Sequence, residues 1–250
     1  MPIMFAGPRT KIERANTHIK ELQREISVFL ARNPYHVGCH PDMESGMDQL
    51  CAVVEELIPE RIWAPIIGDV VHNARSALDL LANDLVPASR RGEATFPIWK
   101  ARDINGNAPT IKGVSEVHQN LIANLQPYVT GDFTLRQLHE LDIEDKHRLL
   151  IPVAAVSVVQ NLSVRRLPNT EPIPFGPREL DASILGIQNL GFSWHSTSRN
   201  RYRPTEDFEF DFKLVFGNAN PFAGVEILPK LHSLVDAASK VIDDFDAQAI

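Results

Sequence analysis

The chain has 250 residues, of which 44% are hydrophobic and 23% are charged, a composition typical of a globular protein with a substantial core. Its formal net charge of −7 excludes a protein that coats nucleic acid or an anionic membrane over its whole surface. It has no apolar run long enough to span a membrane, no signal-peptide pattern and only two cysteines, so we expect a cytoplasmic protein with free thiols.

Two amphipathic helices are predicted in the first third of the chain. Apolar residues recur every three or four positions from Thr10 to Ala31, with Lys, Arg and Glu between them. The same periodicity continues from Trp63 to Val86, where Pro87 ends the second helix. Pro and Gly surround short apolar runs between these helices, which favours a hairpin, although Met47 to Leu57 also fits a helix.

The middle of the chain is predicted to contain a long connection followed by two more helices. Residues 88 to 113 carry Gly, Pro and Asn and one short apolar run, which is typical of a connection that covers other structure. Helical periodicity then returns from Val114 to Gln126 and from Thr134 to about Leu150.

After Pro152 the sequence becomes rich in β-branched residues, which indicates strands. The run "DFEFDFKLVF" alternates apolar and charged residues and predicts a half-buried strand at residues 207 to 216. The side chains expected on its covered face are Phe208, Phe210, Phe212 and Leu214. A last amphipathic helix is predicted from Ile227 to Phe245.

These elements predict an α+β fold. We expect a helical part at residues 1 to 151 that carries the candidate site, with a helical bundle as its architecture. Residues 152 to 250 are expected to form an antiparallel sheet and a C-terminal helix that packs back on the helical part, so that both parts make one unit.

The second predicted helix has an unusual polar side. Within an arc of about 100° it carries short polar and titratable side chains in place of the Lys and Glu that usually solvate a helix. They are His72, Arg75, Ser76, Asp79 and Asn83. A solvated face would explain them most simply.

The fourth predicted helix suggests a second explanation. Its buried stripe is made of leucines, and Asp145 falls in the middle of that stripe. A buried carboxylate requires a cation or several donors. We therefore predict that the two helices pack together, so that Arg75 holds Asp145, Asp79 pairs with Lys146 or His147, and His72 lines a pocket.

Four segments resemble the pattern of a largely uncharacterised family of bacterial proteins. They are "GDVVHNARSALDLLA", "FPI", "LQPY" and "LHELDIEDKHRLL", and the resemblance extends from about Ile67 to Leu150. It implies that eight residues belong to one constellation, without implying an activity. These are His72, Asn73, Arg75, Asp79, Asp145, Lys146, His147 and Arg148.

The chain also shows a looser similarity to HEPN domains, helical bundles that often cleave RNA without metal. Those domains have four to six residues between an Arg and the His that follows it. The corresponding positions after Arg75 hold Leu80, Leu81 and Ala82, so this chain departs from the pattern. Its His72 precedes Arg75 instead.

The constellation leads to one enzymatic hypothesis, a hydrolase directed at phosphodiester, ester or amide bonds, with a nuclease-like activity as the leading form. His72 or His147 would be the general acid or base, and Arg75 or Lys146 would stabilise an anion. Asp79 and Asp145 would orient these groups. Asn73 and Arg148 would bind an anionic or carbonyl-bearing small molecule or RNA in a concave site between the two helices. A homodimer is left open.

Two alternatives stay open for the same residues. The first is a metal-dependent hydrolase or an oxygenase-like helical metalloprotein with a single divalent ion, because Glu144 and His147 form an E-x-x-H pair. The candidate ligands are His72, Asp79, Glu144 and His147. The second is a binding or assembly module in which a buried ion-pair network fixes the register of the helices and does no chemistry.

Other patterns indicate less specific sites. The run "YHVGCH", followed by Cys51, carries zinc-ligand types at a spacing that matches no standard finger. The stretch from Ser193 to Arg203 is basic and aromatic, and with Arg165 and Arg166 it is suited to phosphate contacts. The sequence contains no phosphate-binding loop, dinucleotide fingerprint or G-x-S-x-G motif.

Overall fold

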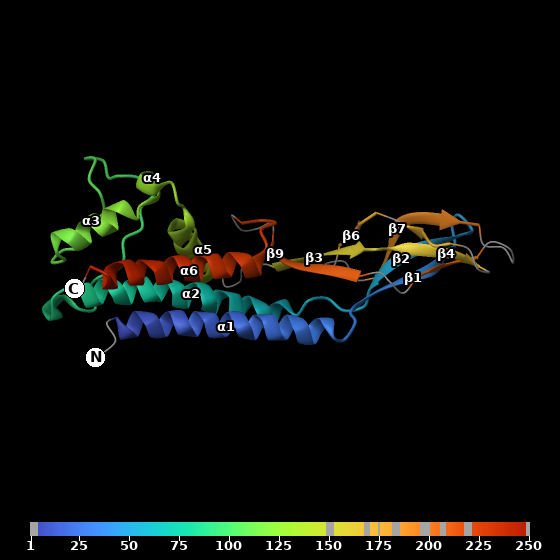
Figure 1. The fold of residues 1–250 in the computed structure, drawn as a ribbon, viewed down its shortest axis with the longest axis horizontal. Coiled ribbons are helices and arrows are strands. Elements are labelled where there is room, and N and C mark those ends of the chain that lie inside the picture. Colours follow the sequence, from blue (N-terminus) through green and yellow to red (C-terminus); the bar gives the residue numbers. More distant parts are fainter. Residues whose placement is uncertain are drawn as a thin grey trace. The chain divides into compact units, whose positions relative to one another are not determined.

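The computed structural model describes residues 5–148, 153–167, 171–174, 176–181, 186–195, 201–205, 209–217 and 222–248. It confirms the α+β fold, with long helices, antiparallel sheets and a C-terminal helix (Figure 1). The chain divides into two compact units. The helical unit contains Met1–Arg24, Arg61–Ile151 and Ile227–Ile250, and the sheet unit contains Glu25–Glu60 and Pro152–Glu226.

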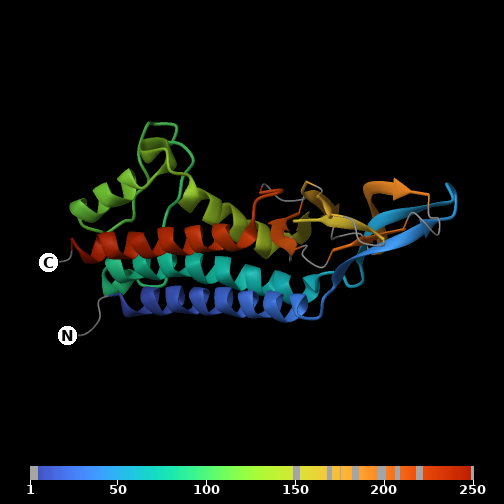
Figure 2. The same cartoon turned by 45° about the vertical axis from the view of Figure 1, so that its right-hand side comes forward.

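The helical unit is built around three long helices that lie side by side (Figures 1 and 2). They are α1 (Ala6–Leu30), of which the residues up to Arg24 belong to this unit, α2 (Glu60–Leu85) and α6 (Ile227–Asp246). The shorter helices are η1 (Ala88–Arg90), α3 (Glu116–Asn124), α4 (Pro127–Thr130) and α5 (Thr134–Arg148). Each helix predicted from periodicity is present, with ends that differ by a few residues.

The core of this unit lies around α2, which is buried on most of its circumference. A helix can be apolar on so many sides only when neighbours cover it, and α2 has such neighbours. Its largest fully buried side chains are Trp63, Ile67, Leu78 and Leu81. The neighbouring helices contribute Ile19 and Leu22 from α1 and Phe245 from α6. Because α2 is packed so closely, its polar groups are largely shielded from water, and each buried one needs a hydrogen-bond partner.

The described residues of the sheet unit form three small antiparallel sheets. The first has the strand order β1 (Tyr35–Asp42), β2 (Met47–Val54) and β7 (Gly186–Trp194). The second has the order β6 (Arg178–Asp181), β3 (Val153–Gln160) and β9 (Glu209–Phe216). The third has the order β5 (Ile173–Pro174), β4 (Ser163–Leu167) and β8 (Arg201–Pro204).

The first sheet resolves the ambiguity in the sequence between the first two long helices. Met47 to Val54 forms a strand, so the hairpin is correct and the helical alternative is wrong. A side-chain hydrogen bond closes the turn between β1 and β2: Ser45 Oγ donates to Asp42 Oδ2 over 2.6 Å. Gly46 follows with a φ of +66°, a conformation that favours glycine.

The predicted strand near the end of the chain is present as β9. Leu214 and Phe216 are buried while Lys213 is exposed, as the alternation requires. Phe208 lies outside the described residues, as do the side chains of Phe210 and Phe212. Among the described helices, none is both long and apolar enough to cross a membrane.

Candidate functional site

The polar side of α2 divides into two groups with different partners. The C-terminal group, Arg75, Asp79 and Asn83, faces the connection that follows the helix. Asp79 Oδ1 accepts a hydrogen bond of 2.9 Å from the backbone N–H of Phe96, and Arg75 Nη2 donates to the carbonyl of Phe96 over 2.8 Å. Both backbone groups of Phe96 are therefore satisfied by α2, and its ring is buried.

Asn83 continues the same arrangement one turn further along α2. Its amide nitrogen donates to the carbonyl of Ala94 over 2.6 Å, and its amide oxygen accepts from the backbone N–H of Gly92 over 2.6 Å. These bonds fix residues 92 to 96 against the helix. We call Arg75, Asp79 and Asn83 the α2 clamp.

The α2 clamp corrects two of the predicted pairs. Arg75 Nη1 lies 2.9 Å from Asp79 Oδ1, one turn away on its own helix, so Arg75 does not hold Asp145. Asp79 is engaged by Arg75 and Phe96 and does not pair with Lys146 or His147. The prediction failed because it considered only side chains as partners, whereas the clamp also binds the backbone.

The N-terminal group on α2 meets a different carboxylate on α5. His72 Nδ1 lies 3.1 Å from Asp142 Oδ1, and His72 Nε2 lies 3.4 Å from Ser76 Oγ on the next turn of α2. Because the carboxylate can only accept, Nδ1 carries a proton and the neutral ring presents Nε2 as an acceptor toward the Ser76 hydroxyl. We call Ser76, His72 and Asp142 the α2/α5 relay.

The relay is buried at one end and open at the other. Asp142 is 3% exposed, whereas the His72 side chain is 48% exposed. Lys146 Nζ lies 2.5 Å from the second oxygen, Asp142 Oδ2, so both carboxylate oxygens are engaged. A buried carboxylate with two such partners holds an imidazole in one orientation, while much of the His72 side chain stays exposed.

His139 of α5 contacts the α2 clamp. Arg75 Nε donates to His139 Nδ1 over 3.4 Å, so this ring nitrogen acts as an acceptor. Burial lowers the pKa of His139, and the charge of Arg75 lowers it further. His139 is therefore neutral near pH 7, which suits a hydrogen-bonding role.

Asp145 occupies a place set by a glycine. A Cβ atom built at Gly68 of α2 would lie 2.8 Å from the carboxyl carbon of Asp145, so the Asp145 carboxylate occupies space that any side chain at position 68 would need. Burial raises the pKa of Asp145, and the nearby carboxylates of Asp142 and Asp69 raise it further.

The remaining predicted residues lie outside the relay. Asn73 is buried and faces α1, where its amide oxygen accepts from Lys11 Nζ over 3.1 Å. His147 is exposed, and Glu144 is half-buried. Arg148 is the last residue of α5, and its side chain is outside the described part of the structure.

The metal hypotheses gain no geometric support. Among the residues that the structure describes, no group of three or more His, Cys, Asp or Glu side chains is placed to hold a metal ion. This applies both to the candidates around His72 and to the "YHVGCH" segment. Cys39 and Cys51 are free thiols, and burial raises the pKa of Cys39 to about 11.

The sequence pattern did not single out Asp142 and His139. Asp142 follows Leu135 by two helical turns and Leu138 by one, so the buried stripe that singled out Asp145 contained it as well. Ser76 belongs to the polar side of α2, but the pattern assigned it no role. His72 lies one turn before Ser76, and this spacing was the available sign of their contact.

Two cavities are described in the helical unit, and neither is lined by His72, Asp145 or His147. One has a volume of about 390 Å³ and lies between Val86 and Lys112. The other, of about 210 Å³, is lined by residues of the α3 to α5 region and α6. The predicted concave site is therefore neither of these, and His72 reaches solvent directly.

Comparisons with protein-family models, curated proteins and solved structures gave no match to this chain.

The close approach at Gly68 can be tested by adding one methyl group. Gly to Ala inside a helix ordinarily stabilises a protein by about 0.5–1 kcal/mol. Here we expect Gly68→Ala to destabilise by about 1–3 kcal/mol, since the methyl group meets the Asp145 carboxylate. In an Asp145→Ala background the same change should become neutral or stabilising. Urea unfolding of the four proteins measures this coupling, and additive effects would contradict it.

The raised pKa of Asp145 predicts how stability depends on pH. Above the ordinary aspartate pKa of about 3.9, the unfolded state ionises more readily than the folded state, so this group lowers stability as the pH rises. Asp145→Asn should therefore stabilise the protein more at pH 7 than at pH 4, as measured by urea midpoints. Asp84→Asn is a matched control, because Asp84 is exposed on α2. An equal gain at both pH values would contradict this assignment.

Proposed function

We propose that the protein is a hydrolase in which His72 is the general acid and base and Ser76 is the nucleophile. The α2/α5 relay is the observation that carries this proposal. It combines a hydroxyl 3.4 Å from one imidazole nitrogen with a buried carboxylate 3.1 Å from the other. Nucleophile, base and orienting group stand in the order that serine hydrolases use, and this constellation is recognised by geometry, whatever the fold that carries it.

Each residue of the relay has a defined task in this reaction. Ser76 Oγ attacks the carbonyl carbon of an ester or amide while His72 Nε2 takes the hydroxyl proton. Asp142 stabilises the imidazolium that results. His72 then returns the proton to the leaving group, and water releases the acyl group by the reverse sequence of steps.

Lys146 supports the relay in this proposal, whereas the α2 clamp has a structural task. Lys146 holds the second oxygen of Asp142, which keeps the carboxylate oriented toward His72. Arg75 and Asp79, which the sequence suggested as catalytic, act on the backbone of Phe96 instead. Asp145 and His147 have no place in the reaction.

A fluorophosphonate probe tests the proposal without knowledge of the natural substrate. Ser76 Oγ would form a bond to phosphorus, fluoride would leave, and His72 would accept the proton. We expect the mass of the probe adduct on the peptide that contains Ser76. The labelling rate should fall about 100-fold or more in His72→Ala and in Asp142→Asn, because both remove base catalysis.

Matched controls separate catalysis from structure. His232 and Ser233 are exposed neighbours on α6, so His232→Ala and Ser233→Ala should label at the wild-type rate. A purely structural ion-pair network makes the opposite prediction: His72→Ala and Asp142→Asn would lower the urea midpoint, and the wild-type protein would carry no adduct at Ser76. That result would overturn the proposed function.

A second candidate function, binding of single-stranded RNA by the sheet unit, is favoured by a group of arginines. Arg165 of β4 lies directly opposite Arg203 of β8, and Arg201 lies two residues away on the same face of β8. All three are exposed. Like charges placed opposite each other in a sheet destabilise it, and a phosphate backbone would offset that cost.

The arginine group predicts a salt-dependent interaction. Replacing Arg165, Arg201 and Arg203 by Gln should weaken binding of a single-stranded RNA. It should also reduce the slope of log affinity against log salt by about 0.7 for each phosphate that the protein no longer neutralises. A triple replacement of the exposed Arg14, Lys20 and Arg61 by Gln removes the same charge from α1 and α2 and should have a much smaller effect. Equal effects in both triple variants would contradict a site on β4 and β8.

A further inference from the structure

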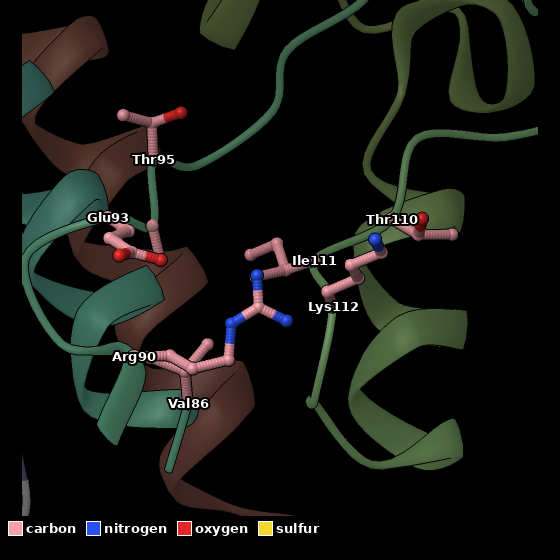
Figure 3. Close-up of a pocket in the computed structure, with 8 residues that line it drawn as sticks. Val86, Arg90, Glu93, Thr95, Thr110, Ile111 and Lys112 are labelled. Carbon is pink, nitrogen blue, oxygen red and sulfur yellow. The ribbon is translucent and has the colours of Figure 1, made fainter. Parts of the chain in front are cut away.

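A cavity of about 390 Å³ lies between the end of α2 and the segment before α3, away from the relay residues. Its lining comes from two stretches of the long connection and the end of α2 (Figure 3). These residues are Val86, Arg90, Glu93, Ala94, Thr95, Thr110, Ile111 and Lys112. This volume is within the range of small-molecule sites, which is about 300–1,000 Å³.

The first wall of this cavity is fixed by the α2 clamp. Asn83 binds the backbone on both sides of Glu93, at Gly92 and Ala94, and Asp79 binds the backbone of Phe96 just beyond Thr95. The side chains of Glu93 and Thr95 therefore project from a backbone that is held in place. Such a wall is formed before any ligand arrives.

The second wall is fixed by a side chain of α3. Gln119 Oε1 accepts from the backbone N–H of Ile111 over 3.1 Å, and Gln119 Nε2 donates to the carbonyl of the same residue. Ile111 is buried, so the neighbouring Thr110 and Lys112 face outward on a fixed segment. Both walls are thus preorganised by amide side chains on α2 and α3.

Two cationic side chains belong to the lining of the cavity. Figure 3 shows the guanidinium of Arg90 beside Ile111 and the ammonium of Lys112 turned toward Thr110, with the carboxylate of Glu93 on the opposite side of Arg90. In the part of the chain that the structure describes, neither cationic side chain forms a hydrogen bond or an ion pair. Two positive charges in the lining of one cavity, in a protein of net charge −7, favour an anionic ligand there.

We propose that this cavity binds a small phosphate monoester that also carries hydroxyl groups. The dianionic phosphate is bound by Arg90, which can donate two parallel hydrogen bonds, and by the flexible ammonium of Lys112. The hydroxyls of the ligand reach Glu93 and the threonines, and the volume beyond the phosphate accommodates a sugar-sized group. The site is independent of the α2/α5 relay, so either proposal can fail without the other.

Calorimetric titration of the full chain with ribose 5-phosphate tests the site, with ribose and inorganic phosphate as comparison ligands. We expect ribose 5-phosphate to bind, inorganic phosphate to bind more weakly, and ribose to give no signal. The double variant Arg90→Gln, Lys112→Gln should bind ribose 5-phosphate with an affinity reduced at least 10-fold. The double variant Arg91→Gln, Lys100→Gln is a matched control, because both residues are exposed neighbours outside the cavity lining.

Glu93→Gln provides a second measurement, in which the affinity for an anion should rise instead of fall. Removing this negative charge should strengthen the binding of inorganic phosphate and weaken the preference for ribose 5-phosphate over it. Urea midpoints of all variants confirm that they are folded. The proposal is overturned if ribose binds as well as ribose 5-phosphate, if no ligand binds, or if the control double variant is weakened as much as the cavity variant.

Discussion

The helical unit depends on the burial of one carboxylate, that of Asp142. An ionised group at that depth costs several kcal/mol unless both of its oxygens are compensated. His72 of α2 supplies one partner and links α5 to α2, and Lys146, one turn further along α5, supplies the other. The same requirement places His72 Nδ1 against Asp142 and leaves Nε2 on the side of Ser76. A demand of packing thereby produces a side chain that is suited to proton transfer.

Most of the fold could be predicted from the sequence, because periodicity reports which face of an element is covered. The helices and the strand before α6 follow directly from the spacing of their apolar residues. The segment from Met47 to Leu57 was ambiguous, since short apolar runs fit either a helix or a strand. Its strand state depends on the antiparallel pairing of β2 with β1 and β7, a long-range contact in the case of β7.

The candidate site was predicted only in part. The sequence correctly placed polar groups of two helices opposite each other, but it favoured Asp145 over Asp142. Both residues fall on the leucine stripe of α5, and only the packed structure distinguishes them. Asp145 lies at Gly68 and is half-buried, while Asp142 is buried and contacts His72. Arg75 was expected to pair with a carboxylate of α5. Its actual acceptor, the backbone carbonyl of Phe96, could not be predicted, because every residue has such a carbonyl and the sequence does not show which one lies near Arg75.

Because of the α2 clamp, the backbone path of residues 92 to 96 in the long connection does not depend on most of the side chains there. Asn83, Asp79 and Arg75 bind main-chain atoms of Gly92, Ala94 and Phe96, so these bonds do not use the side chains of the three residues. Gly92 has a φ of +91°, which favours glycine at that position. Information that specifies the path of this segment is thus encoded in the helix before it. Mutations at positions such as 93 or 95 can consequently accumulate without changing the path of the backbone. The chemical character of that surface can therefore change during evolution while the fold of the segment is kept.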